Sequence, residues 1–199
     1  MPNDTVLYWY TASSYARRVV WYLNLRGLPW ASCIQPPIMP RPDLQALNVN
    51  YRRIPLLSMG KDVYLDTRLI LRKLEERFPD GALGATNPEH RIIERLLERW
   101  MTDGGVFWRA VQLLPVDAGM WMDPAFQKDR ADLTGGRLTR EGLRKLRPEA
   151  VVAMRDCFEL LETTILSDGR EWVFNGSKPS LGDIEGMSDC FFTIIGDWS

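Results

Sequence analysis

The chain has 199 residues, of which 45% are hydrophobic and 26% charged, and its formal net charge is −1 at pH 7. This near-neutral, ordinary globular composition argues against nucleic acid or an anionic membrane as a partner. A single histidine, His90, excludes a two-histidine metal site within one chain, and we expect no metal. The cysteines, Cys33, Cys157 and Cys190, are odd in number and form no Cys-x-x-Cys pair, so a disulfide framework is not expected.

The sequence gives no sign of a targeting or membrane-spanning segment. The first residues lack the basic and apolar regions of a signal peptide. Arginines interrupt the longest apolar stretches well short of the length that a spanning helix needs. We therefore expect a cytoplasmic protein.

The first 80 residues are predicted to alternate between short strands and helices. β-branched and aromatic runs, and a Gly60-Lys61 turn, indicate strands at residues 6–10, 30–35, 54–59 and 62–65. Cap residues and helix stops indicate helices from about residue 14 to 26, within 40–47, and from 66 to about 77. The resulting order βαβαββα implies a mixed sheet with helices on its faces.

The chain beyond residue 80 is predicted to be a linker followed by helices. Gly, Pro, Ala and Asn mark a linker at 81–88. Apolar residues recur at helical spacing over 88–114, 148–166 and 180–195, whereas 115–139 reads as a loop or a broken helix. The predicted domains are therefore an α/β domain at 1–80 and an all-α domain at 89–199.

Four motifs along the chain carry a family resemblance. They are Ser13-Ser14-Tyr15 after the first strand, Ile54-Pro55 before the third, Asp66-Thr67 at the start of a helix, and Ser180-Leu181-Gly182-Asp183 in the helical region. In this order and spacing they resemble the glutathione transferase family, in particular its serine-type zeta and phi classes. The resemblance extends over essentially the whole chain and implies a thioredoxin-like N-terminal domain followed by an all-α domain.

The resemblance implies that a serine activates the thiol of glutathione. In the family this serine precedes an Arg-Val pair by five residues, a spacing that Ser13 fits, and Ser14 is the neighbouring candidate. A hydroxyl at a helix N-terminus would give the thiolate both a hydrogen bond and a positive field. Without the resemblance, a helix N-cap is the more common role of a serine here.

The resemblance also implies a glutathione site, with glutathione as co-substrate and no metal. Its residues are expected to be Arg53, Ile54, Pro55, Asp66 and Thr67. The family's proline is cis, and the backbone of Ile54 would pair with the cysteinyl part of glutathione. Asp66 and Thr67 would hold the γ-glutamyl group at a helix N-terminus. The residues alone leave open a trans proline in an edge strand, a simple helix cap, and a solvated Arg52-Arg53 pair.

The second substrate implied by the resemblance is a small hydrophobic electrophile. Tyr15 and Trp108 are the candidates for its pocket, since such sites are lined by aromatic side chains. At helical spacing, however, Trp100 and Trp108 are more often core residues, and Tyr15 could simply pack. Alkyl or aryl transfer, isomerase and peroxidase reactions are all compatible, as is a role in detoxification or secondary metabolism. The alternative is a binding or structural protein that keeps the fold without turnover.

Two further expectations concern the helical domain. Ser180 and Asp183 are expected to form a buried capping box, in which each side chain bonds the backbone N–H of the other. Relatives usually continue with one or two more helices, so the domain is expected to lack the family's last helices. The resemblance also implies a homodimer that involves the helix beginning near Pro88.

Overall fold

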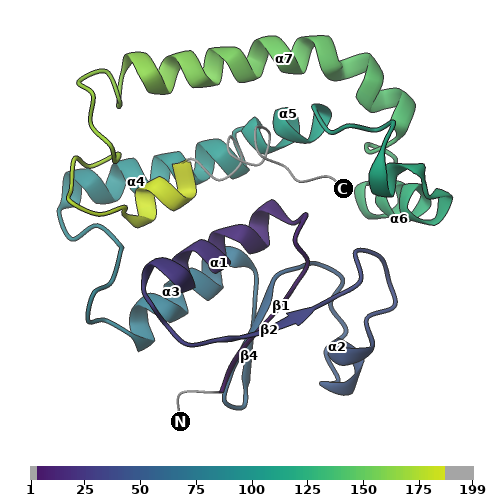
Figure 1. Ribbon diagram of the computed structural model, residues 1–199, viewed down its shortest axis with the longest axis horizontal. Helices are drawn as coiled ribbons and strands as arrows, with labels where there is room; N and C mark the ends of the chain where they lie inside the picture. The colour runs from purple at the N-terminus through teal and green to yellow at the C-terminus, as the bar shows by residue number, and fades with distance from the viewer. Residues whose placement is uncertain (1–3, 187–199) are drawn as a thin grey trace. The chain divides into compact units, whose positions relative to one another are not determined.

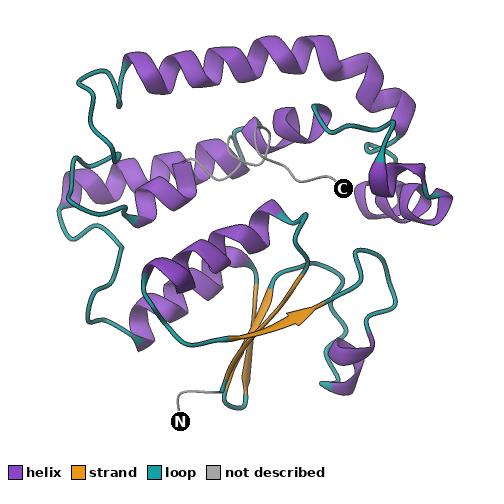
Figure 2. Cartoon of the chain, viewed as in Figure 1, coloured by secondary structure: helices purple, strands orange, loops and turns teal. Residues whose placement is uncertain are grey.

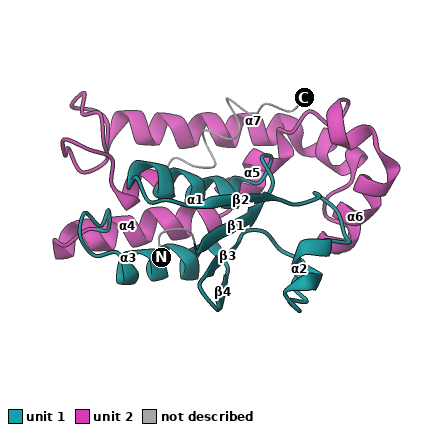
Figure 3. Ribbon diagram, turned by 60° about the horizontal axis from the view of Figure 1, so that its bottom comes forward, with its two compact units in different colours: residues 1–84 teal, residues 85–199 magenta. Residues whose placement is uncertain are grey.

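The computed structural model describes residues 4–186, which fall into two compact units. The N-terminal unit comprises residues 1–84 and the helical unit residues 85–199 (Figure 3). The described strands all lie in the N-terminal unit, and the helical unit is built from helices and loops (Figure 2). The predicted fold class, a thioredoxin-like α/β domain followed by an all-α domain, is confirmed. Cys190 and the predicted helical residues 187–195 lie outside the described part of the chain.

The sheet of the N-terminal unit has four strands in the order β2-β1-β3-β4 (Figure 3). β1 pairs in parallel with β2. Two parallel strands need a crossover connection between them, and the first helix provides it. β3 runs antiparallel to both β1 and β4. The strands are β1 (Thr5–Trp9), β2 (Ala31–Ile34), β3 (Leu56–Met59) and β4 (Asp62–Leu65).

Helices cover both faces of this sheet. α1 (Ser14–Leu25) and α3 (Thr67–Arg77) pack side by side on one face of the sheet (Figure 1). Leu7 and Leu57, which pair across β1 and β3, are fully buried on this face. The alternate residues Tyr8 and Leu56 point to the other face. There they bury Leu44 of α2 (Pro42–Ala46), a helix of five residues. The core therefore spans both faces of the sheet and holds the strand ends in place.

A half-buried carboxylate ties the end of this unit to its helices. Glu75 in α3 accepts hydrogen bonds from the Tyr22 hydroxyl (2.5 Å) and from the backbone N–H groups of Leu83 (2.8 Å) and Gly84 (3.0 Å). Arg26 donates to the Tyr22 oxygen at 2.5 Å. Burial, followed by the neighbouring Glu75 carboxylate, raises the pKa of Tyr22 well above its usual value, so this hydroxyl remains a donor at neutral pH.

The helical unit has one core shared by three helices and a following loop. Its buried residues are Leu97, Met101, Val106, Ala110, Met154, Cys157, Leu161 and Val173. The elements are α4 (Pro88–Thr102), α5 (Val106–Gln112), the short 3-10 helix η1 (Gly119–Met122), α6 (Pro124–Thr134) and α7 (Arg140–Thr163). Within residues 4–186, none of the helices has the length and apolar character needed to cross a membrane.

Two helix boundaries differ from the predictions. The helical pattern predicted over 88–114 is divided between α4 and α5, because Gly105 adopts a φ of +96°, a left-handed conformation that favours glycine. The helix predicted from Pro148 begins eight residues earlier, at Arg140. The Thr139 hydroxyl caps it by accepting from the Gly142 N–H, and Pro148 lies inside the helix despite lacking a donor.

Only part of the apolar stripe of α4 is buried. Leu97 and Met101 belong to the core, whereas Ile92 and Leu96 are 56% and 58% exposed and Ile93 is 37% exposed. Ile92, Ile93 and Leu96 form what we call the α4 patch. Periodicity predicts the helix correctly here, but it does not distinguish a core face from an exposed apolar one.

The expected capping box is half correct. Asp183 accepts from the Ser180 N–H at 2.8 Å, as predicted. The Ser180 hydroxyl, however, donates to the same carboxylate at 2.6 Å rather than accepting from a backbone N–H. The other carboxylate oxygen of Asp183 accepts from the Val173 N–H at 2.7 Å. The buried Asp183 therefore joins the start of the last described helix to the loop after α7.

Replacing Glu75 by glutamine is expected to destabilise the N-terminal unit by about 1–2 kcal/mol, because an amide offers one acceptor oxygen where three donors converge. Urea unfolding followed by tryptophan fluorescence measures this loss. Glu76→Gln is the matched control, since Glu76 lies on the exposed side of α3 and pairs with Lys73 at the surface. Equal stabilities of the two variants would contradict the anchoring role of Glu75.

Asp183→Ala is expected to cost about 2 kcal/mol of stability in the helical unit, since three buried donors lose their acceptor. Ser180→Ala removes only one of these contacts and is expected to cost less than half as much. Thermal unfolding of both variants measures the difference. An Asp183→Ala protein as stable as the wild type would show that the box contributes nothing.

Candidate functional site

One row of the sheet determines where the candidate residues meet. Tyr8 of β1 pairs with Leu56 of β3, which in turn pairs with Leu65 of β4. Because β1 and β4 end here and β3 begins here, three chain segments leave the sheet at the same end. These segments are residues 10–14, 52–55 and 66–67. We call this the site end of the sheet.

Ser13 lies at the site end as the N-cap of α1. Its hydroxyl oxygen accepts from the Ala16 N–H at 3.2 Å, and its own N–H donates to the Tyr10 carbonyl at 3.1 Å. The described residues offer no acceptor for the hydroxyl hydrogen of Ser13, so this proton is available to a ligand. Ser14 is the first residue of α1, and its hydroxyl makes no hydrogen bond within the described chain. Both serines are buried.

The Ile54–Pro55 segment presents free backbone groups. Its peptide bond is cis, as the family resemblance implies. The ladder to β1 begins only at Leu56, and no described residue hydrogen-bonds the N–H or C=O of Ile54. Arg53 is exposed and forms no ion pair with a described residue. A strand-like ligand could therefore pair with Ile54 beside an available cation.

Asp66 and Thr67 form the start of α3, as the sequence predicts. Asp66 is the N-cap, and its carboxylate accepts from the Arg68 N–H at 2.9 Å. The buried Thr67 hydroxyl donates to the Tyr15 carbonyl at 3.1 Å and so joins the first turns of α3 and α1. The helix-cap interpretation is thus confirmed. The N-terminus of an 11-residue helix faces the site end with its positive dipole.

The two candidates for the electrophile pocket belong to different units. Tyr15 is half-buried on α1, with the guanidinium of Arg18 5.3 Å from its ring centroid. Trp108 is half-buried on α5 in the helical unit, edge-to-face with Phe107 at 5.3 Å. Within its own unit, Trp100 packs against the hydrophobic core, so the core interpretation holds for that tryptophan.

The remaining reactive side chains lie away from the site end or serve packing. Cys157 is a buried core residue. Cys33 is half-buried; burial, followed by the neighbouring Asp43 carboxylate, raises the pKa of its thiol. The ring of His90 stacks on Phe174 with centroids 4.4 Å apart. Among residues 4–186 no group of three His, Cys, Asp or Glu side chains could hold a metal.

Sequence reasoning missed one residue near the site end, Arg41. It is 2% exposed and directs its guanidinium at backbone carbonyls, including that of Arg52. The sequence did contain a signal for a buried, hydrogen-bonding arginine, because Arg41 follows a proline-rich loop. Prolines cannot donate hydrogen bonds, so the carbonyls of such a loop need donors from elsewhere.

Comparison with known protein families identifies both parts of the chain. Residues 7–85 match the glutathione S-transferase N-terminal domain, and residues 109–192 match a domain of unknown function (DUF7962). A comparison with curated protein sequences finds no match. The first of these matches contains Ser13, Ile54, Asp66 and Thr67, the residues that the sheet brings to one end.

Solved structures share the fold over nearly the whole chain. A GST-like protein from Pseudomonas syringae is 26% identical with a TM-score of 0.69; the alignment covers 96% of this chain but 58% of that one. A glutathione S-transferase from Rhodospirillum rubrum is 19% identical (TM-score 0.68, coverage 98% and 80%). A homologue from Sulfitobacter, solved with bound glutathione, is 15% identical (TM-score 0.68, coverage 98% and 84%).

The family model places the site end of the sheet in a known domain type, and the solved structures agree with the fold of both units. Residues 7–85 therefore form a glutathione S-transferase N-terminal domain, and the chain as a whole shares its fold with glutathione S-transferases and GST-like proteins.

Proposed function

We propose that the protein is a glutathione transferase that activates the thiol of glutathione for attack on a small hydrophobic electrophile. The observation that carries the proposal is the convergence at the site end of the sheet. A serine with an available proton, an unpaired stretch of backbone and a helix N-terminus leave the sheet side by side. Each of these features fits a different part of glutathione.

Ser13 is the proposed catalytic residue. A free thiol has a pKa of about 8.5, so only a few per cent is ionised at neutral pH. The Ser13 oxygen already accepts from the Ala16 N–H, which leaves its hydrogen to donate to the glutathione sulfur. The positive end of the α1 dipole adds to this stabilisation of the thiolate. Ser14 is the alternative donor, because its hydroxyl is also without a partner among the described residues.

The peptide part of glutathione would lie along the site end. The free N–H and C=O of Ile54, fixed by Pro55, would pair with the cysteinyl backbone in antiparallel fashion. The Asp66 carboxylate can still accept hydrogen bonds from the γ-glutamyl ammonium of glutathione. The backbone N–H groups at the N-terminus of α3, beginning at Thr67, would bind the γ-glutamyl carboxylate. The exposed Arg53 would bind the glycyl carboxylate. The Sulfitobacter homologue with bound glutathione supports this choice of ligand.

The electrophile would be small and hydrophobic, and Tyr15, which follows the two serines on α1, is the aromatic residue of the N-terminal unit proposed to line its pocket. The thiolate displaces a leaving group or adds to the electrophile in alkyl or aryl transfer; isomerase and peroxidase reactions use the same thiolate.

The proposed location is the cytoplasm, where glutathione is available. Cys33 and Cys157 are free thiols, which is the state that a reducing cytoplasm maintains. By analogy with the family, the reaction would serve detoxification or secondary metabolism.

The α4 patch supports a homodimer. Ile92, Ile93 and Leu96 expose a contiguous apolar stripe on α4, the helix that the family resemblance implies in a dimer. Burying this stripe against a second copy would remove it from water. The proposed dimer is therefore formed in part by α4.

Calorimetry with glutathione tests the proposed activity. The wild type is expected to bind, and bound glutathione is expected to show the ultraviolet absorbance of a thiolate at neutral pH. Ser13→Ala should keep the affinity within about threefold but lose the thiolate absorbance, since one charge-assisted hydrogen bond disappears. Ser14→Ala is the matched control and should retain both.

Three results would change the proposal. Loss of the absorbance in Ser14→Ala alone would assign the hydroxyl to the neighbouring serine. Binding without any thiolate signal in the wild type would favour the non-catalytic binding protein. No binding at all would contradict the glutathione site.

Leu96→Glu places a charge in the α4 patch and is expected to convert a dimer into monomers, because an unpaired carboxylate would be buried at the interface. Light scattering coupled to size exclusion measures the mass of each species. Glu89→Gln, on the first turn of the same helix, is the control. A wild-type protein that is monomeric at high concentration would disprove the dimer.

A further inference from the structure

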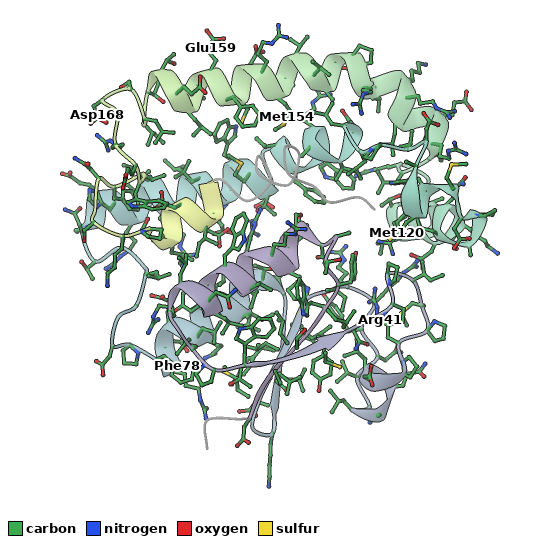
Figure 4. All side chains as sticks on the ribbon, in the orientation of Figure 1. Arg41, Phe78, Met120, Met154, Glu159 and Asp168 are labelled. Carbon is green, nitrogen blue, oxygen red and sulfur yellow. The ribbon has the colours of Figure 1, made fainter. Side chains whose placement is uncertain are left out.

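Arg41 is a buried cation that donates hydrogen bonds to the backbone carbonyls of two segments. It is 2% exposed, and its guanidinium donates to the carbonyls of Pro36 (3.0 Å), Pro37 (3.3 Å) and Arg52. Figure 4 shows it beside α2 in the N-terminal unit. The planar fork of an arginine can serve several acceptors at once, which the single ammonium of a lysine cannot do in the same geometry.

These contacts join two parts of the candidate site. The Arg52 carbonyl lies two residues before Ile54, whose backbone is free to pair with a ligand. The guanidinium also lies 6.0 Å from the centroid of the Tyr10 ring, at the outer limit of a cation–π contact. Tyr10 in turn accepts the N–H of Ser13 through its carbonyl at 3.1 Å. Arg41 therefore contacts the segments that carry the proposed catalytic hydroxyl and the proposed peptide-binding strand.

The loop that carries Arg41 is itself well anchored. The buried Gln35 donates from its N–H to the Trp9 carbonyl at 2.7 Å and from its side-chain amide to Asp43 at 2.9 Å. The two ends of the loop are thus linked to each other and to β1. Leu44, one turn beyond, is buried in the cluster that includes Ile54. Arg41 acts from a fixed base rather than from a free loop.

We propose that Arg41 is a positioning residue of the glutathione site, holding the Ile54 backbone and the Ser13 turn at a fixed separation. The inference rests on the proposed function. Because the side chain is buried and bonds carbonyls, Arg41 acts through residues 52 and 10 and need not touch glutathione. Its contribution is to the geometry of a preorganised binding strand, which raises affinity by reducing the ordering that binding requires.

The test compares Arg41→Lys with Arg26→Lys. Arg26 is a matched control, because it also bonds two backbone carbonyls, those of Phe78 (2.8 Å) and Asp80 (2.7 Å), at the other end of the unit. Both variants keep the charge and lose the fork. Two quantities are measured: glutathione affinity by calorimetry, and amide hydrogen exchange of residues 56–58, at the start of the central strand β3, without glutathione.

Arg41→Lys is expected to bind glutathione about tenfold more weakly and to exchange the amides at the start of β3 faster, because the segment that leads into this strand is no longer held. At saturating glutathione its thiolate absorbance should equal that of the wild type, because Ser13 is untouched. Arg26→Lys should show neither change, even where its overall stability falls. Should Arg41→Lys fail to fold, Tyr10→Leu removes the aromatic contact alone and should still weaken binding, by about threefold.

The inference and the proposed function fail in different ways. A wild type that does not bind glutathione contradicts the proposed function. Amide exchange at the start of β3 still tests the positioning role of Arg41 in the free protein. Unchanged exchange and affinity in Arg41→Lys would overturn the positioning role. Equal losses in Arg41→Lys and Arg26→Lys would overturn it as well, since they would reflect general stability.

Discussion

The register of one row across three strands determines the candidate site. Tyr8, Leu56 and Leu65 lie side by side, so the chain leaves β1, enters β3 and leaves β4 at the same end of the sheet. A shift of one residue would turn the alternating side chains to the wrong faces and would be opposed by the buried cores on both sides. The precision of the site therefore comes from hydrophobic packing several residues away from the polar groups that a ligand would meet.

Polar atoms left over by this arrangement fall into two groups, which have different consequences. Some are satisfied internally, as in the Glu75 anchor and in the carbonyls that Arg41 serves. Others, among them the backbone of Ile54 and the hydroxyl hydrogen of Ser13, find no partner in the described chain. Leaving such groups unpaired is costly in a folded protein unless water or a ligand meets them. Their location at one end of the sheet is the physical basis for proposing glutathione as that ligand.

The sequence was sufficient to predict the fold class and the caps, because both depend on local patterns. Alternating β-branched runs gave the strands, and Asp66 caps α3 as expected. Long-range partners could not be predicted in the same way. The α4 patch reads like a core stripe, Pro148 reads like a helix start, and Arg41 reads like any charged residue in a loop. The role of each of these features depends on which distant residues pack against it. Only for Arg41 did the sequence offer a clue, because the carbonyls of the preceding proline-rich loop need hydrogen-bond donors from elsewhere.

The central claim is that glutathione binds across the site end of the N-terminal unit, along Ile54 and against the start of α3. Titration of nitrogen-15-labelled protein with glutathione, followed by amide chemical shifts, tests this most directly. The account predicts that the amide signals of Ile54, Thr67 and Arg68 move together along one binding curve. Shifts confined to the helical unit, or no shifts at saturating glutathione, would contradict it.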